Sequence, residues 1–201
     1  MDTREWALLI FTILGQVAAG SLFVLMVVRA YAVAKVGVEQ TDRLTDGPLY
    51  IVVPIMGLAL IASLFHLGNP LNIAKAVPNL GTSWLSREVV LAVTFVILAG
   101  VYTLLQWRKI GNNAMRTVIG WIAVLAGLAQ VYGMGMVYMI RTQPSWNTLA
   151  TPVSFFVTGG FFTTTFVTLV AWYMGVTVGR IFAQMDAGAE EIQIYTLAQP
   201  E

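Results

Sequence analysis

Residues 63–90 read SLFHLGNPLNIAKAVPNLGTSWLSREVV, and this stretch decides the fold because it separates two long apolar runs. Its Gly68–Pro70 segment consists of residues that end helices. Ser83 and Ser86, further along, are residues that cap the beginning of a helix. The stretch therefore predicts that one helix ends before residue 68 and that the next begins after a cap at Ser83 or Ser86 and returns alongside it.

The composition outside this stretch is that of a membrane protein. Of 201 residues, 58% are hydrophobic and only 10% are charged, and the mean hydropathy is +0.77. Soluble domains carry about 25% charged residues. Because no segment alternates apolar and polar residues over the roughly 10 positions of a barrel strand, the predicted fold class is an all-α integral membrane protein.

Five stretches are long and apolar enough to span a bilayer, which takes about 20 residues. They are Trp6–Ala32, Leu49–Leu67, Val89–Trp107, Thr117–Ile140 and Pro152–Val178. Helix-breaking residues separate them, including Gly47-Pro48, Gly111-Asn112-Asn113 and Gln143-Pro144. Residues 1–180 are therefore predicted to form a transmembrane bundle, and residues 181–201, which contain four acidic residues, are predicted to form a polar acidic tail.

The distribution of positive charge predicts the orientation in the membrane. Seven basic residues lie on one side, namely Arg29, Lys35, Arg43, Arg108, Lys109, Arg116 and Arg180. Four lie on the other, namely Arg4, Lys75, Arg87 and Arg141. This bias favours a bacterial inner membrane protein whose N-terminus and residue 63–90 loop face the periplasm.

Several function classes are excluded by residue types that the sequence lacks or nearly lacks. There is no cysteine, so this protein cannot itself ligate an iron–sulfur cluster through thiolates or form a disulfide. A single histidine rules out haem with two histidine ligands. No metal site is predicted, and any redox cofactor must be diffusible or belong to a partner. A net charge of +1 without a basic cluster gives no sign of nucleic-acid binding.

The only histidine, His66, and the nearby Glu88 are the leading candidates for chemistry. His66 lies in the last turn of one predicted span, and Glu88 lies in the first turns of the next. Antiparallel neighbours return to the same depth, so the imidazole and the carboxylate can form a proton-transferring pair at the membrane edge. The alternative interpretation, of about equal weight, is that each group only stabilises the end of its own helix.

Three further residues are weaker candidates. Gln16, in mid-span, needs a polar partner and more often joins helices than binds a ligand. Tyr138 and Arg141 lie at the end of the fourth span, on the side of the membrane that carries Glu88. Arg141 is expected to continue the helical face of Gln130, Met134 and Val137, where it can bind a carbonyl group, pair with Glu88 or simply anchor the helix at the interface.

Taken together, residues 63–90 resemble the membrane-anchor subunit of dimethyl sulfoxide reductase and its close relatives among the complex iron–sulfur molybdoenzymes. The resemblance rests on the HLGNP turn, the NLGTSWLSRE loop and the apolar span that follows. It is reinforced by QVAAG in the first span and YMIRTQPSWNT after the fourth.

The resemblance implies a haem-free anchor that oxidises a quinol, usually menaquinol, beside an iron–sulfur partner subunit. That partner passes electrons to a molybdopterin catalytic subunit during anaerobic respiration. The family's quinol-site histidine and glutamate fall on His66 and Glu88, with Arg141, Tyr138 and Gln16 as further candidate quinol contacts. Such a subunit supplies the quinol site and does not itself reduce the terminal acceptor.

Family anchors are expected to have about eight spans, whereas five are predicted in this sequence. The expectation is therefore that the sequence is a piece of a longer protein or a shortened homologue. Two other functions stay open, namely a purely structural anchor without quinol chemistry and a small proton or ion transporter. The transporter ranks last, because such proteins place ionisable residues near the midplane in repeated halves.

Overall fold

The computed structural model describes residues 3–66, 78–167 and 169, and only the backbone at residues 3–5 and 64–66. The protein divides into two compact units, residues 1–164 and 165–201, and the account below concerns the first. The predicted acidic tail, the predicted boundary at residue 180 and the end of the fifth predicted span lie outside the described residues.

Long helices make up the described structure. They are α1 (Thr3–Val36), α2 (Val38–His66), α3 (Trp84–Arg108) and α4 (Asn113–Val137), followed by a fifth helical segment over Ala150–Val167. All five are long and apolar enough to cross a membrane, and no strand occurs in the described part of the protein. The prediction of an all-α protein with five membrane-spanning helices is confirmed.

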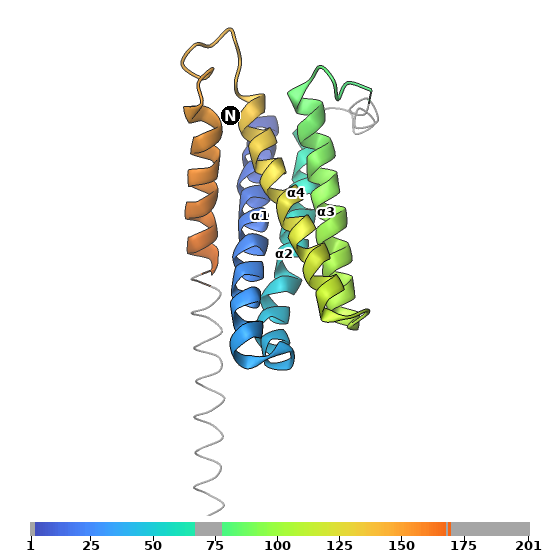
Figure 1. The fold of residues 1–201 in the computed structure, drawn as a ribbon. Coiled ribbons are helices and arrows are strands. Elements are labelled where there is room, and N and C mark those ends of the chain that lie inside the picture. The colour runs from blue at the N-terminus through green and yellow to red at the C-terminus, as the bar shows by residue number, and fades with distance from the viewer. Residues whose placement is uncertain (1–2, 67–77, 168, 170–201) are drawn as a thin grey trace, which may run out of the picture. The chain divides into compact units, whose positions relative to one another are not determined.

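Consecutive helices run in opposite directions (Figure 1). The tight α1–α2 and α3–α4 connections therefore lie at one end of the bundle, which we call the turn end. The end of α2, the beginning of α3 and the end of α4 lie at the other, which we call the loop end. Contacts are most extensive between α1 and α2 and between α3 and α4, and are much sparser between α2 and α3.

The predicted break at Gly47-Pro48 was wrong. Helix α2 begins at Val38 and continues through Pro48, so its first turns contain the polar segment that was predicted to be a loop. Only Gly37 separates α2 from α1, and its positive φ of 82° suits glycine. The hydroxyl of Thr41 donates to the Gly37 carbonyl at 2.7 Å. Contacts made by this polar segment with other helices override the local preference for a loop.

The strongest of these contacts belongs to Arg29 of α1, whose side chain is only 2% exposed. One guanidinium nitrogen lies 2.6 Å from a carboxylate oxygen of Asp42 and donates to the hydroxyl of Thr45. The other donates to the side-chain oxygen of Asn113 at 2.8 Å. A single buried cation therefore joins α1, α2 and the first residue of α4.

Asp42 also connects α2 to the end of α3. The ammonium of Lys109 lies 2.8 Å from Asp42 and 2.6 Å from Asp46, and the Gln106 amide donates to both carboxylates. Burial lowers the pKa of Lys109, but its bonds to the two carboxylates outweigh this effect and hold the pKa above its ordinary 10.5. Because the folded-state pKa is raised, this contribution to stability is complete below pH 10.5 and is lost as pH rises through the folded-state value.

We expect Asp42→Asn to destabilise the bundle by roughly 3–5 kcal/mol, because it leaves the buried Arg29 charge without a counter-ion. Arg43→Gln is the matched control, since it breaks only an exposed pair with Glu39, worth about 0–1 kcal/mol. Unfolding in mixed micelles with increasing denaturing detergent measures both changes. Equal losses for the two variants would contradict the role given to Asp42.

Candidate functional site

The end of α2, the beginning of α3 and the end of α4 lie at the loop end (Figure 1), and they carry the predicted site residues except Gln16, which lies within α1. Helix α3 begins there, and its N-cap is Ser83, whose side-chain oxygen accepts a hydrogen bond from the backbone N–H of Ser86. Ser83 was one of the two predicted caps. The cap defines where α3 starts and so places Glu88 in the second turn, as predicted.

Glu88 is buried, with only 7% of its surface exposed. It packs against α4 at Gly133, where an added Cβ would lie 3.5 Å from the Cα of Glu88. Within the described residues, the Glu88 carboxylate makes no hydrogen bond or salt bridge. Burying a carboxylate without a partner is energetically costly, so this position carries the strongest sign of function at the loop end.

Tyr138 lies within electrostatic range of Glu88. It is the C-cap of α4, and its backbone N–H bonds to the Gly135 carbonyl. Burial raises the pKa of the Tyr138 phenol, and the negative charge of Glu88 raises it further. The ring packs 5.3 Å from Phe155 and 6.3 Å from Trp146, measured between centroids. The structure therefore brings two of the predicted site residues together, one from α3 and one from the end of α4.

The sequence suggested that Arg141 continues a helical face of the fourth span, and this prediction was wrong. Helix α4 ends at Val137, and the backbone turns immediately, with the N–H of Ile140 donating to the Tyr138 carbonyl. Arg141 is exposed in this turn, and no ion pair joins it to Glu88 in the structure as described. Its contact with a ligand stays a prediction.

Helix α2 is described as far as His66, and the Gly68–Pro70 segment that was predicted to end it lies outside the described residues. Its side chain and residues 67–77 lie outside what the structure describes. The pairing of His66 with Glu88 therefore stays a prediction.

Arg87 is held by the loop before α3. Its guanidinium donates to the carbonyls of Leu80 and Gly81 at 2.8 and 3.0 Å and lies 4.4 Å from the centre of the Trp84 ring. These contacts fix the loop to the first turn of α3. Arg87 therefore ties the loop to the helical turn that precedes Glu88.

Gln16 contacts the fifth helical segment. It is buried, accepts a long hydrogen bond of 3.4 Å from the Thr158 hydroxyl, and lies where a Cβ at Gly159 would be in ordinary contact. The predicted interhelical contact is present. No contact between Gln16 and Glu88 is found among the described residues, and its binding to a quinol stays a prediction.

Gln130 is a polar residue whose importance the sequence did not show. It is fully buried, and neither its amide nitrogen nor its amide oxygen has a hydrogen-bond partner in the described structure. It lies beside Gly15 of α1 and one turn before Gly133, which contacts Glu88. A glutamine within an apolar run was the available signal, but the sequence could not show that this amide is left without a partner.

We expect Gln130→Leu to stabilise the bundle by roughly 1–3 kcal/mol, since it removes a buried unsatisfied amide at similar volume. Gln16→Leu is the matched control and should cost about 0.6 kcal/mol, the average for a hydrogen bond between membrane helices. Detergent unfolding of both variants measures the difference. A loss of stability in Gln130→Leu would mean that its amide is satisfied in the membrane.

Comparison with known proteins identifies the family. A family model described as the DMSO reductase anchor subunit (DmsC) matches residues 1–185. The protein belongs to this family. Members are membrane anchor subunits of DMSO reductase-like complexes.

In the described residues, no three histidine, cysteine, aspartate or glutamate side chains gather so as to hold a metal.

Individual relatives agree with the family match. The sequence is 32% identical over 156 residues to the corresponding component of the anaerobic dimethyl sulfoxide reductase of Escherichia coli, covering 77% of this protein and 53% of that one. It is 32% identical over 159 residues to YnfH, an anaerobic dimethyl sulfoxide reductase component of the same organism, with the same coverage.

A component of the sulfite dehydrogenase of Allochromatium vinosum is 28% identical over 160 residues, which cover 74% of this protein and 49% of that one. The sequence thus spans about half the length of these relatives. No solved structure matches it significantly.

Proposed function

We propose that this anchor subunit oxidises a quinol, usually menaquinol, at the loop end of its bundle. The observation that carries the proposal is the buried Glu88 carboxylate, which has no partner among the described residues and lies at the end where α2 finishes with His66. Membership of the anchor family supports a redox role, and ionisable residues buried in membrane proteins are characteristically functional.

Oxidation of a quinol to a quinone releases two electrons and two protons. His66 accepts a proton from a quinol hydroxyl, because neutral imidazole is a competent base near pH 6.5. Glu88 orients His66 or relays that proton to the outer surface, and the second quinol proton follows the same route once His66 is neutral again. The two electrons leave separately to the nearest iron–sulfur cluster of a partner subunit, so proton and electron routes diverge at the ring.

The neighbouring residues shape the rest of the site. Tyr138, within electrostatic range of Glu88, lies at the end of α4 and supplies a phenol hydroxyl for hydrogen bonding to the ring. Arg141, just beyond the last helical residue of α4, supplies an exposed cation near the surface. Gln16 is a further candidate contact from α1.

The partners proposed for this subunit are an iron–sulfur electron-transfer subunit and a molybdopterin catalytic subunit, docked at the periplasmic face of the inner membrane in anaerobic respiration. Relatives named as parts of a dimethyl sulfoxide reductase and of a sulfite dehydrogenase support an assembly of several proteins. The absence of cysteine from the sequence is consistent with iron–sulfur clusters that reside in a partner.

We expect His66→Ala to lower quinol-dependent turnover of the assembled complex by roughly 100-fold or more, the contribution of a general base. Turnover with a soluble artificial donor should stay near wild type, because that donor bypasses the membrane site. Steady-state assays with both donors measure the two rates. Wild-type turnover with quinol would overturn the role of His66, and equal loss with both donors would show that the residue serves assembly.

Glu88→Gln should slow quinol oxidation less than His66→Ala does, and it should change the pH dependence of the rate. The glutamine side chain keeps the shape of the glutamate side chain but cannot titrate. Glu39→Gln is the matched control, since Glu39 is exposed at the turn end. The measurement is the quinol-dependent rate between about pH 5 and 8, where histidine and coupled carboxylates titrate. An unchanged rate and profile would remove Glu88 from the mechanism and leave a purely structural anchor.

A further inference from the structure

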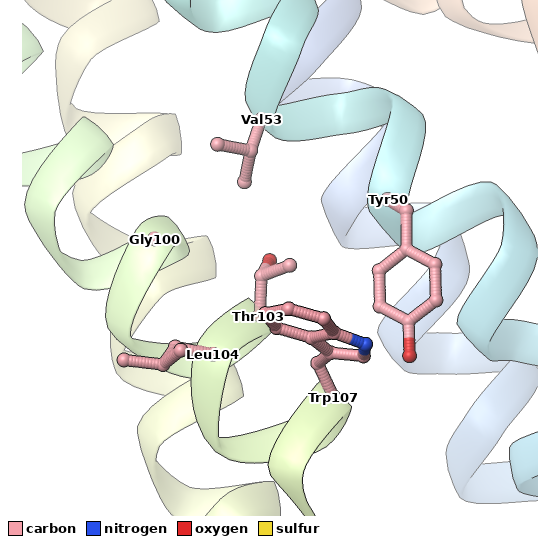
Figure 2. A pocket seen from close by; sticks show the side chains of 6 residues that line it. All are labelled: Tyr50, Val53, Gly100, Thr103, Leu104 and Trp107. Atoms are coloured by element: carbon pink, nitrogen blue, oxygen red, sulfur yellow. The ribbon is translucent and has the colours of Figure 1, made fainter.

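Helices α2 and α3 enclose a cleft on the half of the bundle nearer the turn end. Their mutual contacts are much sparser than those between α1 and α2 or between α3 and α4, and they leave a cavity of about 310 Å³. Six residues line it, namely Tyr50, Val53, Gly100, Thr103, Leu104 and Trp107 (Figure 2). Because Leu104 and Trp107 are about half exposed, the cleft opens toward the surrounding lipid.

No packing contact among the described residues explains why position 100 is a glycine. A Cβ added there would meet nothing within 4 Å. At Gly127 of α4, by contrast, a Cβ would press on Phe95 and Ala19, so that glycine serves the packing of helices. Glycine weakens a helix interior relative to alanine. Gly57 of α2 likewise faces open space, so Gly100 is informative because it also lines the cleft, where its missing side chain leaves room for an occupant.

The walls of the cleft are apolar but carry three polar groups. The Thr103 hydroxyl is buried and has no hydrogen-bond partner in the described structure, although threonines in helices commonly bond to their own backbone. The indole of Trp107 reaches from α3 toward Tyr50 on α2 (Figure 2). Tryptophan and tyrosine favour the depth of lipid headgroups and ester groups. The cleft thus combines an apolar interior with a polar rim.

A positive charge lies beside this rim. The guanidinium of Arg108 lies 4.8 Å from the centre of the Trp107 ring and is exposed. No acidic residue among those described forms a salt bridge with it. The next residue, Lys109, differs because Asp42 and Asp46 hold it. Arg108 is therefore the cation at this rim that can meet an external anion.

We propose that the α2–α3 cleft binds an anionic phospholipid, with one acyl chain against Gly100 and its phosphate at Arg108. The apolar walls fit the acyl chain, the Thr103 hydroxyl can donate to an ester oxygen, and the exposed guanidinium complements the negative headgroup. An uncharged isoprenoid quinone would leave Arg108 without a counter-ion. A helix of another protein would leave the Thr103 hydroxyl unsatisfied unless it supplied a matching acceptor.

The test uses the full-length protein in nanodiscs that contain equal amounts of phosphatidylglycerol and phosphatidylethanolamine with identical acyl groups, together with menaquinone. Native mass spectrometry then counts the molecules that stay bound after release. We expect about fivefold preference for phosphatidylglycerol, as one basic residue at a membrane surface provides. Arg108→Gln should abolish the preference, and Gly100→Leu should lower retention of both phospholipids by filling the cleft.

Gly57→Leu is the matched control, because a Cβ at Gly57 also meets nothing within 4 Å and the residue does not line the cleft. It should retain phosphatidylglycerol like the wild type. Equal retention of the two phospholipids, retention of menaquinone in their place, or unchanged binding in Arg108→Gln would each overturn the proposal. Should Gly100→Leu fail to fold, the exposed Arg108→Gln variant still decides the outcome.

Discussion

The buried ion pair between Arg29 and Asp42 is the constraint on which the arrangement of the helices depends. The Arg29 side chain is 2% exposed, and both terminal nitrogens of its guanidinium meet acceptors, while its Nε has no partner among the described residues. Here the acceptors come from α2 and from Asn113 of α4, while Lys109 ties the end of α3 to the same carboxylate. Apolar packing in lipid alone would not prevent one helix from sliding along its neighbours. Here such sliding is opposed because it would break a charged contact.

The two ends of the bundle hold their buried charges differently. At the turn end, Asp42 pairs with both Arg29 and Lys109, although the buried Arg116 of α4 forms no ion pair with a described residue. At the loop end, Glu88 is buried without a described partner, so its burial costs stability that the rest of the bundle must supply. The ion pairs at the turn end contribute to that stability, and a carboxylate held in a fixed position is what the proposed quinol site requires.

The sequence predicted the features that depend on local patterns. Apolar length revealed five helices, and the serine before Trp84 revealed where α3 starts and so where Glu88 lies. It failed where distant residues decide the outcome. The Gly47-Pro48 pair resembles a helix break, yet contacts of Asp42 with Arg29 keep the segment helical. Arg29 was counted only as an orienting charge, since nothing in the sequence shows that it is buried. The unsatisfied Gln130 amide likewise depends on which side chains the other helices place around it.

The role of each glycine in this protein depends on which atoms face it. At Gly127 the missing side chain admits Phe95 and Ala19, so helices approach closely. At Gly133 it admits the backbone of α3 at Glu88, and a larger residue there would push the carboxylate away from Tyr138. At Gly100 it admits nothing from the described residues. The first two positions are explained by packing between helices, and the third leaves room in the α2–α3 cleft for the proposed phospholipid.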